Sequence, residues 1–227
     1  MEIEVLKVVC SVMDNNTYIV YRENERTALI IDPSFCTDKY ERAMETYDLE
    51  GAAILLTHGH FDHIASVDAL RNKYHCPVYI HKNDADMLTD PEKNQSGSMM
   101  REPVATAPAD HIIDGEEMLA VGGMTVKVVE TPGHTPGGVC YIIDGQLFTG
   151  DTLFPTDTGY VVFETGSAED MEKSIKKLDS LLTDDYMIWP GHEENVSMTF
   201  VRSHNKDYTG YLQGIYPEHT SLDPESL

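Results

Sequence analysis

Seven consecutive residues carry most of what this sequence says about its fold and chemistry: Thr57-His58-Gly59-His60-Phe61-Asp62-His63. Three histidines and one aspartate occupy positions 58 to 63. His58 and His60 are two residues apart, so in an extended loop both rings point to the same side. Asp62 and His63 stand at the start of a predicted helix and point elsewhere. Because imidazole and carboxylate groups are ordinary transition-metal ligands, this spacing favours one metal ion on the first pair and a second ion on the other.

Three more candidate ligands follow predicted strands further along the chain. They are His134 after 125–129, Asp151 after 146–149 and His192 after 186–189. A glycine directly precedes each of them, and glycine permits a sharp bend of the backbone. Taken alone, each would be an ordinary loop or turn residue. Because loops at strand ends converge on one point, their occurrence together with the 57–63 stretch predicts a shared metal site.

The predicted strands fall into two groups along the chain, and each group is followed by a helix. The predicted strands are 16–21, 27–31, 52–56, 77–80, 125–130, 139–143, 146–149 and 186–189, and the predicted helices are 38–47, 62–73, 84–88 and 167–182. Asp144-Gly145 is a strong two-residue hairpin signal. Residues 89–111 are polar and predict a long loop, and residues after about 205 predict an irregular acidic tail. This pattern indicates two sheets with helices outside, in a single domain spanning 1–227.

The composition narrows the classes of partner. The chain has 227 residues, of which 41% are hydrophobic, as in a globular protein. Its 39 acidic and 16 basic residues give a net charge of −23, so nucleic acid and anionic membrane surfaces repel it. The sequence contains no apolar run long enough to span a bilayer, and residues 1–20 lack a signal-peptide pattern. Four scattered cysteines, at 10, 36, 76 and 140, indicate reduced thiols in a cytoplasmic protein.

These motifs together resemble the metallo-β-lactamase superfamily, and within it the glyoxalase II-like (hydroxyacylglutathione hydrolase-like) hydrolases. The matching segments run in order from about Val12 to His192: the 57–63 stretch, then 132–137, 150–154 and 190–192. The resemblance implies an α/β (α+β) protein with an αβ/βα four-layer sandwich, in which two packed mixed β-sheets are flanked by helices. The site is then expected at one edge of the two sheets.

The resemblance also implies a division of the ligands between two metal ions. One ion is expected on His58, His60 and His134, the second on Asp62, His63 and His192, with Asp151 bridging them. Asp32 matches an aspartate that family members place behind the ligands, although by itself it reads as a turn residue.

The activity implied is that of a binuclear metal-dependent hydrolase of small thioesters or esters. Two divalent ions, expected to be zinc with iron or manganese as alternatives, share a bridging hydroxide that attacks the carbonyl carbon of the substrate. Asp62 is the expected catalytic residue, since it is placed to orient the hydroxide or take its proton. The expected partner is a small-molecule substrate, with neither nucleic acid nor a membrane.

Departures from the glyoxalase II pattern keep other activities open. The stretch 158–161 contains no arginine, where relatives of that branch carry Gly-Arg-x-Asp. A persulfide dioxygenase would hold a single iron on His58, His134 and Asp151, and the same missing arginine counts against it. A lactonase relative would have a tyrosine where Phe154 stands. A nuclease needs a basic surface, oxygen-reducing diiron relatives have a glutamate in place of the second histidine of the 57–63 stretch, and non-catalytic binding modules usually lose ligands. The hydrolase is therefore favoured.

Overall fold

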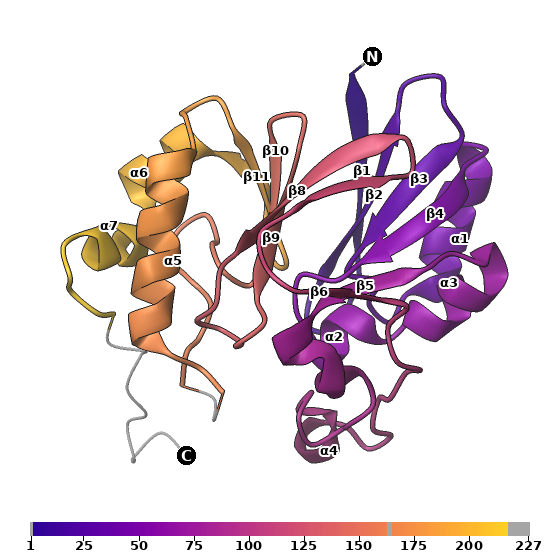
Figure 1. Ribbon diagram of the computed structural model, residues 1–227, viewed down its shortest axis with the longest axis horizontal. Helices are drawn as coiled ribbons and strands as arrows, with labels where there is room; N and C mark the ends of the chain where they lie inside the picture. The colour runs from indigo at the N-terminus through magenta and orange to yellow at the C-terminus, as the bar shows by residue number, and fades with distance from the viewer. Residues whose placement is uncertain (1, 163–164, 218–227) are drawn as a thin grey trace.

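The computed structural model describes residues 2–162 and 165–217, which form two six-stranded sheets between layers of helices (Figure 1). The first sheet has the order β1-β2-β3-β4-β5-β6 and the second β12-β11-β10-β9-β8-β7. The strands are β1 (Ile3–Val9), β2 (Asn16–Arg22), β3 (Thr27–Ile31), β4 (Glu50–Leu55), β5 (Val78–His81), β6 (His111–Ile113), β7 (Met118–Val121), β8 (Met124–Glu130), β9 (Val139–Ile143), β10 (Gln146–Gly150), β11 (Met187–Pro190) and β12 (Val196–Ser197). The helices are α1 (Thr37–Thr46), α2 (Phe61–Ile64), α3 (Val67–Tyr74), the 3-10 helix η1 (Lys82–Leu88), α4 (Ser96–Met99), α5 (Ala168–Leu181), α6 (Met198–His204) and α7 (Lys206–Leu212). The expected four-layer arrangement is confirmed.

The first sheet begins with antiparallel strands and continues with parallel ones. β1, β2 and β3 pair antiparallel, whereas β3 through β6 run parallel. Parallel neighbours need a crossover connection, and α1 and α3 supply the crossovers on either side of β4. Tyr40 and Met44 of α1 and Leu70 of α3 are buried against Ile54 of β4. These helices therefore cover the outer face of the first sheet.

The second sheet is antiparallel from β7 to β10, and β11 then joins β10 in parallel. Asp144 and Gly145 make the predicted hairpin turn with φ of 44° and 79°, the positive values that a type I′ turn requires. α5 is the crossover between β10 and β11, and its Ile175 packs with Ile188 in the outer core of this sheet. Figure 1 shows α5, α6 and α7 on this side of the molecule, opposite α1 and α3.

The inner faces of the two sheets share one core. Leu29 and Leu55 of the first sheet and Val126 and Val128 of the second are fully buried in it. The two valines alternate with the less buried Thr125 and Lys127, as expected for a strand with one face in the core. Burying each such side chain contributes about 1.5–3 kcal/mol, so this inner core holds the two sheets, and the loops at their edge, in a fixed relation.

Two predicted helices have a different form in the structure. The helix expected at 62–73 is divided into α2 and α3 at Ser66, whose amide donates to the carbonyl oxygen of Pro33 at 2.9 Å and whose hydroxyl donates to that of Ser34. These bonds take the place of helical ones and interrupt the helix. The helix expected at 84–88 is the 3-10 helix η1, capped by the His81 side chain.

Both ends of the chain contain more structure than predicted. β1 lies outside the predicted elements, although it pairs with the whole length of β2. The prediction of an irregular tail from about 205 is wrong for residues 206–212, which form α7. Tyr208 and Tyr211 bury their rings beside α5 and hold this helix in place. Residues 218–227 of the predicted tail lie outside the described residues.

Within the described part of the chain, every helix is too short or too polar to cross a membrane. The four cysteines are free, with Cys10, Cys76 and Cys140 buried and Cys36 partly exposed.

Candidate metal centre

The seven predicted ligands lie together where strands of both sheets end at the same edge of the molecule. His58 follows β4, His134 follows β8, Asp151 comes directly after β10, and His192 follows β11. The remaining three are on or beside the short helix α2: His60 is its N-cap, and Asp62 and His63 lie within it. The structure therefore brings all seven side chains together. Their role as metal ligands stays a prediction.

The first cluster consists of His58, His60 and His134, and all three are buried. One ring nitrogen from each lies within 4.8 Å of those of the other two. The shortest separation is 2.9 Å, between Nε2 of His134 and Nδ1 of His60. The three rings meet edge to face with centroid separations of 4.6–5.0 Å, so their nitrogens converge on a common point.

The second cluster consists of Asp62, His63 and His192, whose candidate ligand atoms also lie within 4.8 Å of one another. Asp62 Oδ2 is 3.5 Å from His63 Nε2 and 3.4 Å from His192 Nε2. The carboxylates of Asp151 and Asp62 outweigh the effect of burial and raise the pKa of His192 to about 10. Without a metal ion, the ring of His192 is therefore protonated at neutral pH and paired with these two carboxylates.

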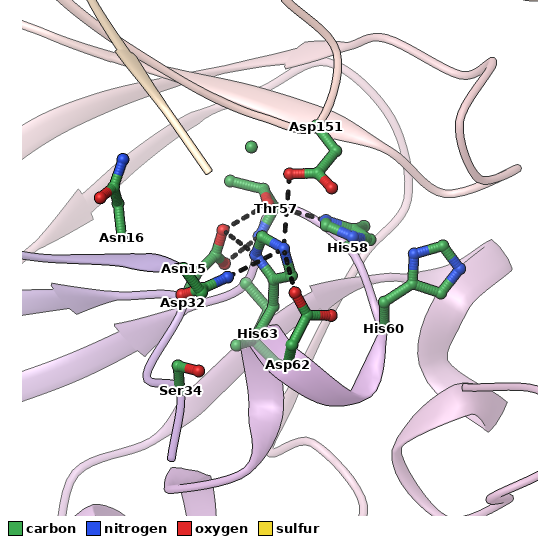
Figure 2. A network of polar contacts seen from close by, with 12 residues as sticks. Asn15, Asn16, Asp32, Ser34, Thr57, His58, His60, Asp62, His63 and Asp151 are labelled. Atoms are coloured by element: carbon green, nitrogen blue, oxygen red, sulfur yellow. Dashed lines mark hydrogen bonds and ion pairs between the residues drawn. The ribbon is translucent and has the colours of Figure 1, made fainter. Parts of the chain in front are cut away.

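Asp151 lies between the two clusters. Its Oδ1 is 3.4 Å from His63 Nε2, and its Oδ2 is 3.6 Å from His134 Nε2 and 3.5 Å from His192 Nε2. Figure 2 shows its carboxylate pointing down onto His63. Burial alone would raise the pKa of Asp151, but His192 and His63 outweigh burial and hold it well below its ordinary value. Asp151 is therefore an ionised group that faces both clusters.

Hydrogen bonds on the far side of three rings set their orientation. Nδ1 of His134 donates to the carbonyl oxygen of Tyr160 at 2.7 Å, and Nδ1 of His192 donates to that of Met13 at 2.9 Å. Nδ1 of His63 donates to Asp32 Oδ2 at 3.0 Å. Such bonds fix which ring nitrogen carries the proton. In each ring Nε2 faces the centre, as a ligand atom must.

Asp32 is part of the structure behind the ligands rather than a simple turn residue. It is buried and adopts a left-handed backbone conformation with φ of 50°. Its Oδ1 accepts from the Thr57 amide at 2.8 Å, and its Oδ2 accepts from the Thr57 hydroxyl at 2.5 Å as well as from His63 (Figure 2). Asp32, His58 and His63 also lie close enough to form a third candidate metal cluster. Because both oxygens of Asp32 already accept hydrogen bonds, we assign it to positioning His63 and Thr57.

Asp84 links the two loops that carry the first cluster, and the sequence pattern does not identify it as a residue of the site. Its Oδ2 accepts from the amide of Gly59 at 3.2 Å and the hydroxyl of Thr135 at 2.7 Å. Its Oδ1 accepts from the amide of Gly137 at 2.7 Å. Burial raises the pKa of this carboxyl above its ordinary value, although these hydrogen bonds act to lower it. The only sequence signal is a carboxylate within a predicted helix, and such residues are usually exposed.

The long segment 89–111 forms one wall of the site. Gln95, with φ of 71°, places its side-chain nitrogen 2.9 Å from Nε2 of His60. Together with Met99 it borders a cavity of about 310 Å³ above the clusters. The residues that line this cavity are Met13, His60, Phe61, Asp62, Gln95, Met99, His134, Asp151, Phe154, Asp157, Thr158, Gly159, Tyr160, His192 and Glu193. The sequence predicts the length of this segment but not its contact with His60.

The donor set fits divalent transition metals. The buried Nε2 of His58 has no hydrogen-bond partner among the described residues, and such an atom is costly unless something else satisfies it. Burial lowers the pKa of His58 well below its ordinary value, and burial together with His134 lowers the pKa of His60 to about 3. Both rings are therefore neutral and keep a lone pair. Neutral imidazoles with carboxylates are the donors that zinc and similar ions take in proteins.

Comparisons with known proteins agree with this geometry. The family model described as Metallo-beta-lactamase superfamily matches residues 11–192. The chain is 33% identical to the probable metallo-hydrolase YqgX of Bacillus subtilis over 198 residues, which cover 86% of this chain and 93% of that protein. It is 30% identical to the probable polyketide biosynthesis zinc-dependent hydrolase BaeB of Bacillus velezensis over 191 residues, 84% of this chain and 78% of that protein. Among solved structures, the BLEG-1 B3 metallo-beta-lactamase superposes with a TM-score of 0.87 at 33% identity, covering 91% of this chain and 100% of that chain. The extent of these matches, together with the fold and the two clusters, shows that the chain belongs to the metallo-beta-lactamase superfamily.

Proposed function

We propose that this protein is a two-metal hydrolase of small thioesters or related esters, of the glyoxalase II-like kind. The observation that carries the proposal is the pair of clusters, each with three converging candidate ligands, that share Asp151 between them. In this proposal one ion is held by His58, His60 and His134, the other by Asp62, His63 and His192, and both by Asp151. The name of BaeB as a zinc-dependent hydrolase supports zinc as the metal, with iron and manganese as alternatives.

Divalent ions at such a centre polarise a carbonyl group and make water reactive at neutral pH. The chain's own residues keep the geometry fixed around them. His63, His134 and His192 are each held through Nδ1, so their rings do not have to reorient when substrate arrives. Phe61 and Phe154 are buried side chains that line the cavity and make its wall beside the clusters apolar.

Asp62 is the proposed catalytic residue. Burial raises its pKa, but His63 and His192 outweigh burial and hold the pKa below its ordinary value. The side chain is therefore a carboxylate at neutral pH, and it borders the cavity. A carboxylate in this position can orient an attacking water molecule and accept its proton.

Replacement of Asp62 tests the mechanism. We expect Asp62→Ala to lower kcat for thioester hydrolysis by about 100-fold or more, with an unchanged circular dichroism spectrum. The zinc-loaded protein is assayed by release of free thiol, and bound metal is measured in parallel. Asp38→Ala, at an exposed aspartate in the first turn of α1, is the matched control and should keep full activity. Full activity of Asp62→Ala would contradict the assigned role.

The metal content of the purified protein separates this proposal from the dioxygenase alternative. We expect two metal equivalents per chain, together with hydrolysis of thioesters. One iron per chain with thiol-dependent uptake of oxygen would overturn the hydrolase and support the dioxygenase. Hydrolysis of lactones in place of thioesters would support the lactonase alternative.

A further inference from the structure

The cavity above the two clusters has apolar walls. Met13, Phe61, Met99, Phe154 and Tyr160 all line it. Three of them are well exposed, Met13 and Met99 at 52% and Tyr160 at 58%. They come from the loop between β1 and β2, from the end of α4 and from the segment after β10, and they converge on one opening. Large exposed apolar side chains that gather in this way usually mark a surface that binds an apolar ligand.

Apart from the predicted ligands, the charged groups described at this opening are acidic. Besides the predicted ligands Asp62 and Asp151, the described lining includes the exposed carboxylate of Glu193 and contains neither lysine nor arginine. Lys7 lies beside Glu193, and its Nζ is held by the carbonyl oxygen of Glu193 at 2.9 Å and by the carboxylate of Glu194 at 2.8 Å. An anionic group on a substrate would therefore meet like charge at the opening.

Resting on the proposed function, we propose that the substrate is a thioester with an uncharged, apolar acyl chain, and that glutathione thioesters are poor substrates. The carbonyl group lies at the clusters, and the acyl chain lies against Met13, Met99 and Tyr160. In the reaction the oxygen of one water molecule bonds to the acyl carbon and the carbon–sulfur bond breaks. The products are a carboxylic acid and a free thiol, and the proton that water loses passes by way of Asp62 to the departing sulfur.

A series of acyl thioesters of N-acetylcysteamine, an uncharged thiol, tests the acyl preference. With the zinc-loaded protein we expect kcat/KM to rise about two- to fourfold per added methylene from acetyl to hexanoyl, because each methylene leaves water for an apolar wall. For one acyl group, S-hexanoylglutathione should be hydrolysed at least about tenfold less efficiently than S-hexanoyl-N-acetylcysteamine.

Two variants connect this preference to the cavity. Met99→Ala should reduce the slope of log kcat/KM against the number of acyl methylenes to about half of its original value. Met118→Ala is the matched control, since Met118 is 61% exposed but does not line the cavity, and it should leave the slope unchanged. Glu193→Gln should narrow the gap between the glutathione and N-acetylcysteamine thioesters about threefold at low salt, because it removes one repelling charge.

The outcomes distinguish this inference from the proposed function. If thioesters are hydrolysed but the rates do not depend on acyl length, or the glutathione thioester is preferred, the acyl assignment is overturned and the hydrolase proposal stands. If the protein loaded with two metal equivalents hydrolyses none of the thioesters, the proposed function fails and this inference fails with it.

Discussion

At the scale of single residues, the site depends on carboxylates of three kinds. Asp62 and Asp151 face the clusters, Asp32 holds His63 from behind, and Asp84 holds the main chain of two loops. All four are buried or nearly so. A buried carboxylate is stable only where donors or cations surround it, so each of them specifies the position of several neighbours.

Asp84 provides a prediction at this scale. Asn at this position can accept with one oxygen only, so either Gly137 on one side or Gly59 and Thr135 on the other lose their acceptor. We expect Asp84→Asn to lower the free energy of unfolding by about 1–3 kcal/mol and to weaken zinc binding about tenfold. Competition with a chelating dye measures the affinity. Asp86→Asn is the control, because exposed Asp86 pairs with Lys93 at the surface. Equal zinc affinities of the two variants would show that Asp84 does not position the ligand loops.

At the scale of elements, strand ends and helix starts determine where the ligands lie. Gly150 has φ of 48° as β10 ends, and a side chain there would collide with Thr57. The same close approach brings Asp151 next to the 57–63 stretch from the other sheet. α5 begins at the loop of His134, because the Ser167 amide donates to the carbonyl oxygen of Gly133 at 2.8 Å.

The start of α5 supplies a prediction at this scale. The Ser167 side chain accepts from the Asp170 amide at 3.2 Å and so caps the start of the helix. Loss of such a cap typically costs about 1 kcal/mol. We therefore expect Ser167→Ala to lower the urea midpoint at an unchanged m-value. Ser180→Ala, at an exposed position within the same helix, should leave the midpoint unchanged or raise it slightly. A midpoint of Ser167→Ala equal to that of the original protein would rule out a stabilising cap.

At the scale of the whole molecule, the site joins two halves that the chain builds one after the other. The 58–63 ligands belong to the first sheet and its helices, and the other three follow strands of the second. Between them, the amide of Val139 donates to the carbonyl oxygen of Thr57 at 2.8 Å, and the hydroxyl of Tyr141 donates to that of Leu56 at 2.7 Å. Metal ions in the two clusters would bind groups from both halves and favour the folded state alone.

Removal of metal is the prediction at this scale. A ligand present at 100 times its Kd stabilises the folded state by about 2.7 kcal/mol, which for a domain of this size is a shift in Tm of about 5–10 °C. We expect a chelator to lower Tm by this amount and added zinc to restore it, as measured by calorimetry. Identical Tm values with and without chelator would contradict metal binding at these clusters.

Much of the fold can be predicted from the sequence, because the local sequence signals agree with the final structure. The hairpin at Asp144-Gly145, the alternation in β8 and the apolar face of α5 each depend on residues that are near one another in sequence. Predictions were wrong where distant contacts decide the local form. Carbonyl groups of the loop after β3 divide the helix at Ser66, and burial beside α5 makes 206–212 helical.

By itself, the sequence determined the set of seven candidate ligands and the order of strands that carries them, because histidines and aspartates directly after strands are a local pattern. Only the tertiary structure decided that Asp84 and Gln95 support those ligands, and which groups Asp32, placed behind the ligands by the family resemblance, holds. Asp32, Asp84 and Gln95 reach the site through the packing of loops that are far apart in the chain. The apolar opening has the same origin, since Met13, Met99 and Tyr160 become neighbours only when the two sheets close on their common core. Local sequence patterns identify the candidate ligand side chains, whereas the packing of the two sheets against each other determines where those side chains meet.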